Sequence, residues 1–316
     1  MSQRKPALDG SAVVLIVLCC VVWGLGQVST KVALAEFGPF TQVAIRSLGA
    51  AVLLMAWSRW RGIALVDRDG TWGAGALVGL LFALEFACIF VGLQYTTASR
   101  MVVFVYLAPF VVALGMPLVA RSERLDRWQL AGLVAAFAGV AWAFAEGFAK
   151  PSAGDRQWLG DALGVAGAVL WGATTLAIRA TSLSQAAAEK TLFYQLAVSG
   201  VAMAVAAFVA GEPWSARFTP WPLAAMGFQA VIVCFVSYLV WFWLIRHYPA
   251  TQLSAFTLLT PVFGLVAGVM LLGEPMTARL LVALGTVAVG IALVNRLRPA
   301  PRTALPASPP QPRQGD

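Results

Sequence analysis

Charged residues are scarce in this sequence. Asp, Glu, Lys and Arg together make up 11% of its 316 residues, whereas a soluble domain carries about 25%. Hydrophobic residues make up 60%, and the mean hydropathy is +0.80. So few charges cannot cover the surface of a soluble globular protein. The composition therefore predicts an all-α polytopic membrane protein, whose long apolar runs face lipid.

Histidine and cysteine are too few, and too scattered, for metal or redox chemistry. His247 is the only histidine, and the four cysteines, Cys19, Cys20, Cys88 and Cys234, lie inside apolar segments without a CxxC pair. Such cysteines pack as small hydrophobes. We therefore expect no metal site, no cofactor and no His-based catalytic triad.

Motifs of several protein classes are also missing. No P-loop GxxxxGK[ST] is present, so ATP does not drive this chain directly. An HExxH site, convergent carboxylates and a selectivity-filter pattern are absent, which disfavours an enzyme and an ion channel. The net charge of +8 comes from residues at the ends of apolar segments. Because they form no patch, a nucleic-acid partner is not expected.

Apolar runs long enough to cross a membrane, at about 20 residues each, occur ten times. Turn signals such as Gly38-Pro39 and Gly273-Glu274-Pro275 separate them. The first run is longer than the apolar part of a signal peptide, so it reads as a helix that spans the membrane. The predicted spans are 11–33, 40–58, 72–94, 99–119, 128–146, 160–180, 190–210, 221–245, 252–272 and 278–295.

Basic residues are divided unevenly between the two sides of the membrane. With both termini cytoplasmic, 15 of the 22 Lys and Arg residues lie in inside segments and five lie outside. The remaining two, Lys31 and Arg46, lie in or near the membrane. The positive-inside rule therefore favours this orientation.

Landmarks of the first half recur in the second half, in order and 148 to 153 residues later. Single matches arise by chance in apolar sequences, but the series indicates a duplication. Because each half has five spans, the second half must insert the opposite way, as in many transporters. The predicted regions are a cytoplasmic N-terminus (1–10), a first five-helix repeat (11–146), a linker (147–159), a second, inverted repeat (160–295) and a disordered cytoplasmic tail (296–316). The matched landmarks are Trp23-Gly24 and Trp171-Gly172, Lys31 and Arg179, Arg46 and Gln195, Tyr95 and Tyr248, Pro109 and Pro261, and Glu123 and Glu274.

Several of these segments match a known pattern: VVWGLGQVSTK at 21–31, AIRSLGAAVLL at 44–54, SERLDRWQLAGLVAAFAGV at 122–140 and VLWGATTLAIR at 169–179. In these segments the sequence resembles the drug/metabolite transporter superfamily, specifically its EamA-type members, over residues 11–295. The resemblance implies ten helices around a central cavity, a bacterial inner-membrane location, and a monomer that moves a small molecule by alternating access.

Within the family, the sequence is similar to bacterial exporters of aromatic amino acids and methyl viologen. This similarity implies export of aromatic or other neutral amino acids. Export of other metabolites or of cationic drugs is the alternative, and a membrane-embedded protein without transport activity is a further one.

Two charged residues lie well inside predicted spans. Glu85 lies about 13 Å, and Arg46 about 9 Å, from the outer ends of their spans at 1.5 Å per residue. A charge at a helix centre costs at least about 2.5 kcal/mol. Glu85 can line the path, bind an amino group or take up a proton; alternatively, Arg46 and Glu85 form a charge pair that locks the bundle. The second half has Gln195 and Tyr238 at these places, so symmetry does not require the pair.

Other polar and aromatic residues lie deeper than an interfacial belt. Together they can form a pocket for a ring-bearing zwitterion, although packing between helices is the commoner role for any single one of them. Pro109 and Pro261 lie mid-span at matched places and are predicted hinges. Arg100 either guards the outer mouth or anchors the interface. The predicted cavity residues besides Glu85 are Trp23, Gln27, Tyr106, Trp171, Thr175, Tyr238, Trp241, Ser254 and Thr257.

Overall fold

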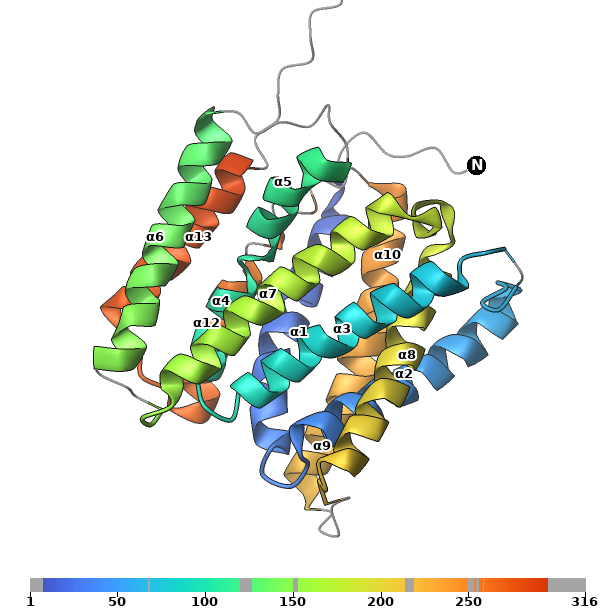
Figure 1. Cartoon of the computed structure of the whole chain (residues 1–316), viewed down its shortest axis with the longest axis horizontal. Helices are drawn as coiled ribbons and strands as arrows, with labels where there is room; N and C mark the ends of the chain where they lie inside the picture. The colour runs from blue at the N-terminus through green and yellow to red at the C-terminus, as the bar shows by residue number, and fades with distance from the viewer. Residues whose placement is uncertain are drawn as a thin grey trace, which may run out of the picture.

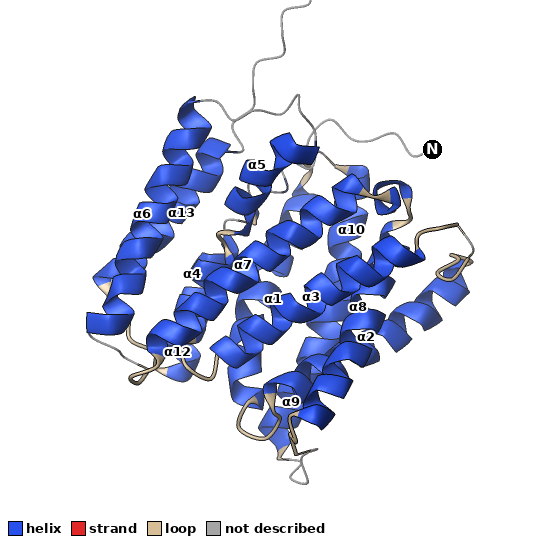
Figure 2. Ribbon diagram, in the orientation of Figure 1, coloured by secondary structure: helices blue, strands red, loops and turns tan. Residues whose placement is uncertain are grey.

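The computed structural model describes residues 8–67, 69–119, 127–149, 153–213, 219–248, 253, 256–257 and 259–294. Within these ranges every regular element is a helix, and loops join the helices (Figure 2). The first half contains α1 (Gly10–Ala33), α2 (Pro39–Arg61), α3 (Trp72–Gly92), α4 (Ala98–Val105), α5 (Ala108–Val119) and α6 (Arg127–Ala149). The second half contains α7 (Gln157–Ala180), the 3-10 helix η1 (Ser182–Gln185), α8 (Ala188–Val209), α9 (Pro220–Gly227), the π-helical segment η2 (Phe228–Ser237), α10 (Tyr238–His247), α12 (Leu259–Leu272) and α13 (Ala278–Val294).

Seven helical stretches in the described part are long and apolar enough to cross a membrane. They are α1, α2, α3, the α4–α5 stretch, α7, α8 and the stretch Pro220–Leu244. Three shorter apolar helices, Leu130–Ala143, Leu259–Leu272 and Ala278–Gly290, lie within the predicted fifth, ninth and tenth spans. The chain is thus an all-helical, multi-pass membrane protein, while the count of ten spans and the inversion of the second half stay predictions.

Helices of the two halves pack against one another. Three helices of the first half contact helices of the second half: α1 contacts α12, α2 contacts α8, and α3 contacts both α7 and α8. Helices α6 and α13 lie side by side at one edge of the bundle (Figure 1). Glycine permits close approaches between these helices: a Cβ at Gly24 of α1 would lie 2.7 Å from the backbone nitrogen of Gly264 in α12.

The ends of the helices follow local sequence rules. Asp9 caps α1 by accepting a hydrogen bond from the Ala12 N–H at 2.9 Å. Helix α2 begins at Pro39, because the first residue of a helix needs no N–H donor. Its C-cap is Gly62, in the left-handed conformation (φ 67°). These signals explain why the predicted boundaries of the first two spans agree closely with the structure.

The predicted fourth span is not one continuous helix. Helix α4 ends at Val105 and α5 begins at Ala108. Pro109 has no N–H to bond the Val105 carbonyl, so the α-helical pattern cannot continue. Tighter bonds replace it, from the Leu107 N–H to Phe104 O at 3.1 Å and from the Phe110 N–H to Leu107 O at 3.0 Å. The break therefore lies near the middle of the Ala98–Val119 stretch.

Candidate functional site

Arg46 of α2 and Glu85 of α3 are both buried, with 3% and 5% of their surface exposed. The Arg46 guanidinium packs on the ring of Phe86, the residue after Glu85, yet no ion pair within 4.0 Å joins Arg46 and Glu85 in the structure described. Arg46 Nε and Nη2, and Glu85 Oε2, are buried without a hydrogen-bond partner. The predicted charge pair is therefore not a direct ion pair. It consists of two buried charged groups with unused hydrogen-bonding capacity.

Aromatic rings hold the Arg46 guanidinium in place. Its central carbon lies 3.8 Å from the ring centroid of Phe86 and 4.9 Å from that of Phe90, both on α3. Such contacts reach about 2 kcal/mol when they are shielded from water. Tyr238 packs against the same buried cluster as Phe86. Tyr238 is also the residue that the predicted repeat pairs with Glu85.

The predicted deep aromatic residues form two ring pairs. Trp23 donates from Nε1 to Ser237 Oγ at 2.8 Å, and its ring meets Trp241 edge-on with 5.5 Å between centroids. Tyr106 meets Trp171 edge-on at 5.8 Å. Trp171 in turn packs against the same buried cluster as Phe86. The structure thus gathers side chains from α1, α7, α10 and the α4–α5 turn near the two charges.

The remaining predicted polar residues differ in their surroundings. Gln27 is half-buried, and its Oε1 has no hydrogen-bond partner. Thr175 uses its hydroxyl on the Trp171 carbonyl of its own helix at 3.1 Å, as expected for packing. Thr257 lies in the turn before α12, and Ser254 lies outside the described residues. Gln27 is therefore the member of this group with capacity left for a ligand.

The two predicted hinge prolines lie close to the starts of helices. Pro109 is the second residue of α5, and Pro261 is the third residue of α12. Before Pro261 the Thr260 N–H bonds to Thr257 O at 3.0 Å, which spans three residues like the bonds beside Pro109. The interruption of a helix is described for the first half, between α4 and α5, and the residues just before α12 lie partly outside the described ranges.

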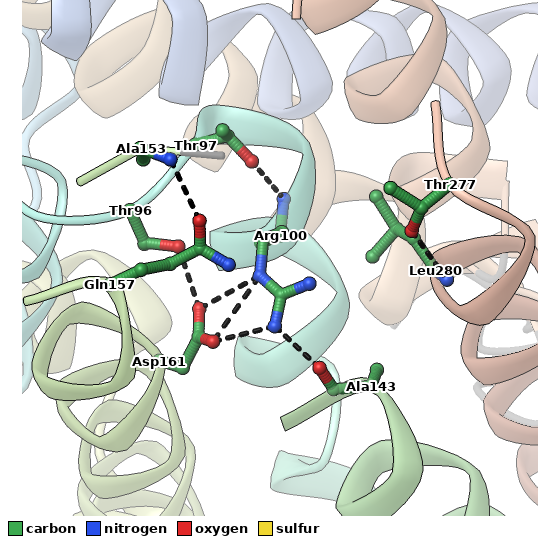
Figure 3. A network of polar contacts seen from close by, with 9 residues as sticks. All are labelled: Thr96, Thr97, Arg100, Ala143, Ala153, Gln157, Asp161, Thr277 and Leu280. Carbon is green, nitrogen blue, oxygen red and sulfur yellow. Dashed lines mark hydrogen bonds and ion pairs between the residues drawn. The ribbon is translucent and has the colours of Figure 1, made fainter. Parts of the chain in front are cut away.

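A buried polar network surrounds Arg100 at the end of the bundle where α4 begins (Figure 3). Arg100 Nε and Nη2 contact the Asp161 carboxylate at 3.1 and 2.6 Å, and these two residues are 3% and 0% exposed. Arg100 Nη2 also donates to the Ala143 carbonyl, and Thr96 Oγ1 donates to Asp161, both at 2.6 Å. Lys31 Nζ donates to the Thr96 carbonyl. The network ties α1, α4, α6 and α7 together.

Glu274 strengthens the same end of the bundle. From the loop after α12, its carboxylate accepts from the Ala98 N–H at 2.7 Å and from the Ser99 N–H and hydroxyl at 2.9 and 2.7 Å. It therefore caps α4 from the other half of the chain, where a negative charge also favours the helix dipole. Glu212 caps α2 in the same way, through Phe40 and Thr41.

A smaller ionic cluster lies at the opposite end of the bundle. Lys190, whose side chain is 3% exposed, contacts Asp67 and also Asp69, the latter at 2.6 Å. The hydrogen bond from Lys190, together with that from the Thr71 hydroxyl, lowers the pKa of Asp69 to about 2. This cluster joins the loop between α2 and α3 to the start of α8.

Sequence reasoning missed most partners in these two end networks. Asp161 and Lys190 lie near the starts of predicted spans, and no motif in the sequence singles them out as partners. Glu212 and Glu274 both occur in Gly-Glu-Pro, at 211–213 and 273–275, and that repetition was the available signal. No cluster of His, Cys, Asp and Glu in the described part of the chain could hold a metal ion.

Comparisons with known proteins show which family the chain resembles. The EamA-like transporter family model matches the chain twice, at residues 10–145 and 158–296. The chain is 26% identical over 296 residues to "Uncharacterized transporter YvbV" of Bacillus subtilis (strain 168), covering 92% of this chain and 93% of that protein. It is 21% identical over 296 residues to "Uncharacterized inner membrane transporter YedA" of Escherichia coli (strain K12), covering 87% of each. A crystal structure with 17% identity has a similar fold, with a TM-score of 0.62 over 90% of this chain and 97% of that one.

Proposed function

Because the chain belongs to the EamA-like transporter family, we propose that it is a secondary transporter that exports amino acids from bacteria. Aromatic and other neutral amino acids are the favoured substrates, and the bacterial inner membrane is the favoured location. A membrane transporter is already what its relatives are named. Our proposal adds two points to this: the substrate is an amino acid, and the direction of transport is export.

The observation that carries the proposal is the pair of buried charges amid aromatic rings. Ionisable side chains inside a membrane protein are costly and usually mark a substrate or ion path. Arg46 and Glu85 supply one charge of each sign, both buried and both with unused hydrogen-bonding atoms. A zwitterion offers the complementary charges, and the nearby rings of Trp171 and Tyr106 suit an aromatic side chain.

Alternating access is supported by the duplicated layout. The family model matches each half separately, and a hydrogen bond that spans three residues precedes each of the two matched prolines. In transporters with inverted repeats, the halves rock about a site near the middle of the membrane. The network around Arg100 would then hold the predicted outer end closed, and export would require it to open.

Transport in liposomes tests the proposed function. Purified protein in liposomes should move radiolabelled phenylalanine, tryptophan or leucine faster than protein-free liposomes do. A pH gradient of either sign, imposed in parallel, reports whether protons drive the flux. If none of a panel of neutral amino acids moves above the protein-free control, the substrate assignment is wrong. Movement of methyl viologen alone would favour the cationic-drug alternative.

A further inference from the structure

Arg100 shows how this protein binds a carboxylate. Its Nε and Nη2 lie on the same edge of the guanidinium and contact the two oxygens of Asp161, Nε to Oδ1 at 3.1 Å and Nη2 to Oδ2 at 2.6 Å. A ring of Phe104 lies 5.4 Å from the guanidinium carbon. The planar fork of arginine matches a carboxylate in this two-bond arrangement, which lysine cannot reproduce.

Arg46 presents the same edge without a carboxylate. Its Nε and Nη2 are the two atoms that are buried and lack a hydrogen-bond partner. Phe86 and Phe90 lie against the guanidinium at 3.8 and 4.9 Å from their centroids, so they pack against it but supply no acceptor. Buried donors of this kind are nearly always satisfied in folded proteins. The unfilled fork therefore points to a group that comes from outside the chain.

The surroundings of Arg46 narrow the class of that group. Glu85 has a buried, unpartnered Oε2, and it directly precedes Phe86, whose ring packs against the Arg46 guanidinium. It is nevertheless further from Arg46 than a 4.0 Å ion pair allows. A ligand that carries an anion and a cation on neighbouring atoms would satisfy both groups. An α-amino acid has this arrangement, because its carboxylate and ammonium group share one carbon atom.

We propose that Arg46 binds the carboxylate of the substrate through Nε and Nη2, while Glu85 binds its ammonium group. This inference rests on the proposed function and makes it specific: the transporter recognises the α-amino-acid zwitterion first, and the side chain second. Analogues that lack either charge should bind weakly. Phenethylamine lacks the carboxylate, and 3-phenylpropanoate lacks the ammonium group, so the two analogues separate the two roles.

Binding to the purified full-length protein in detergent, by calorimetry, tests the assignment. Wild type should bind phenylalanine at least about tenfold more tightly than either analogue, because each lost charged hydrogen-bond group is worth at least that factor. Arg46→Gln should lower the affinity for phenylalanine about 100-fold and leave the affinity for phenethylamine unchanged. Glu85→Gln should weaken phenylalanine and leave 3-phenylpropanoate unchanged. Arg46→Lys keeps the charge but loses the two-bond geometry of the guanidinium. Its affinity for phenylalanine should lie between those of wild type and Arg46→Gln.

Arg59→Gln is the matched control, because Arg59 is an exposed arginine on the same helix. It should bind all three compounds as wild type does. The proposal is overturned if Arg46→Gln binds phenylalanine as wild type does, or if it weakens phenylalanine and phenethylamine equally. If Arg46→Gln does not fold, equal affinity of wild type for phenylalanine and phenethylamine overturns it as well.

Binding and flux separate the two hypotheses. Binding that depends on Arg46, without any amino-acid flux in liposomes, would support the carboxylate site and contradict the transport function. Flux that is equal for phenylalanine and phenethylamine would support transport and contradict the role of Arg46.

Discussion

At the residue scale, the protein treats its buried charges in two different ways. Arg100 is fully engaged, by the Asp161 carboxylate and the Ala143 carbonyl. Arg46 and Glu85 are as deeply buried but keep unpartnered atoms. Leaving a buried charged group unsatisfied costs more than the 1–3 kcal/mol of a neutral one. The stability of the fold therefore explains why Arg100 is buried, but it does not explain the burial of Arg46. Binding of a ligand carboxylate would explain it.

The ionic cluster of Lys190 gives a prediction about pH. Asp69 has its pKa lowered to about 2 by Lys190 and Thr71. A lowered pKa stabilises the folded state above the unfolded value of 3.8, and that contribution is lost as the pH falls through about 2. Asp69→Asn should therefore lower the melting temperature slightly at pH 7, and the difference from wild type should narrow below about pH 4.

Melting curves of both proteins in detergent at several pH values would measure this difference. Since Asp69 is partly exposed, 0.5 M salt should also reduce it. A difference that grows as the pH falls would have the wrong sign and would contradict the role given to Asp69.

At the element scale, the interrupted helices carry a prediction about rate. Pro109 and Pro261 each follow a hydrogen bond that spans three residues, and Pro109 lies where α4 and α5 are interrupted. If these breaks are hinges, Pro109→Ala should stiffen the α4–α5 stretch and slow the conformational step. We expect the transport rate to fall about tenfold, equivalent to about 1.4 kcal/mol in the barrier, with phenylalanine affinity unchanged.

Pro261→Ala should have a similar effect if the two halves move alike, and Pro117→Ala, a substitution near the end of α5, is the control. Flux and binding measured on the same preparations separate rate from affinity. A Pro109→Ala protein with wild-type flux would show that the break is structural and does not act as a hinge.

Elements could be predicted from the sequence to different degrees. The first span was predicted at 11–33 and is Gly10–Ala33, because hydropathy depends only on local residues. The break after Val105 was missed as a boundary, although Pro109 was noted. The pairing of Glu274 with Ala98 joins residues 176 positions apart, and no local pattern contains it. Similarly, the predicted depths of Arg46 and Glu85 in the membrane indicate that the two residues are near each other. Whether they form an ion pair depends on the direction of each side chain, which is set by packing.

At the scale of the whole molecule, separate polar networks hold the two ends of the bundle. The predicted outer end combines the Arg100–Asp161 pair with the Glu274 cap, and these residues come from both halves. Nearly all of this network is buried. For a transporter that alternates, a buried network at one end is a closed gate whose opening must separate charged partners.

Breaking one partner of the buried pair should therefore shift the balance between closed and open outer ends. Asp161→Asn leaves Arg100 with a buried, poorly paired charge, which typically costs about 3–5 kcal/mol. Opening the outer end lets water reach Arg100 and relieves that cost. In a background without the four native cysteines, Leu93→Cys reports the opening, because Leu93 is 0% exposed and belongs to the same buried cluster as Ala98, whose N–H donates to Glu274.

A membrane-impermeant thiol reagent should label this cysteine at least about tenfold faster in the Asp161→Asn protein than in its parent, which corresponds to a population shift of about 1.4 kcal/mol. Glu274→Gln should act in the same direction with a smaller effect, since an amide oxygen still accepts from one N–H of α4. Asp69→Asn, at the opposite end, should leave the labelling rate unchanged. Equal labelling in all four proteins, with melting temperatures showing that each is folded, would mean that the Arg100 network stabilises the fold without controlling access.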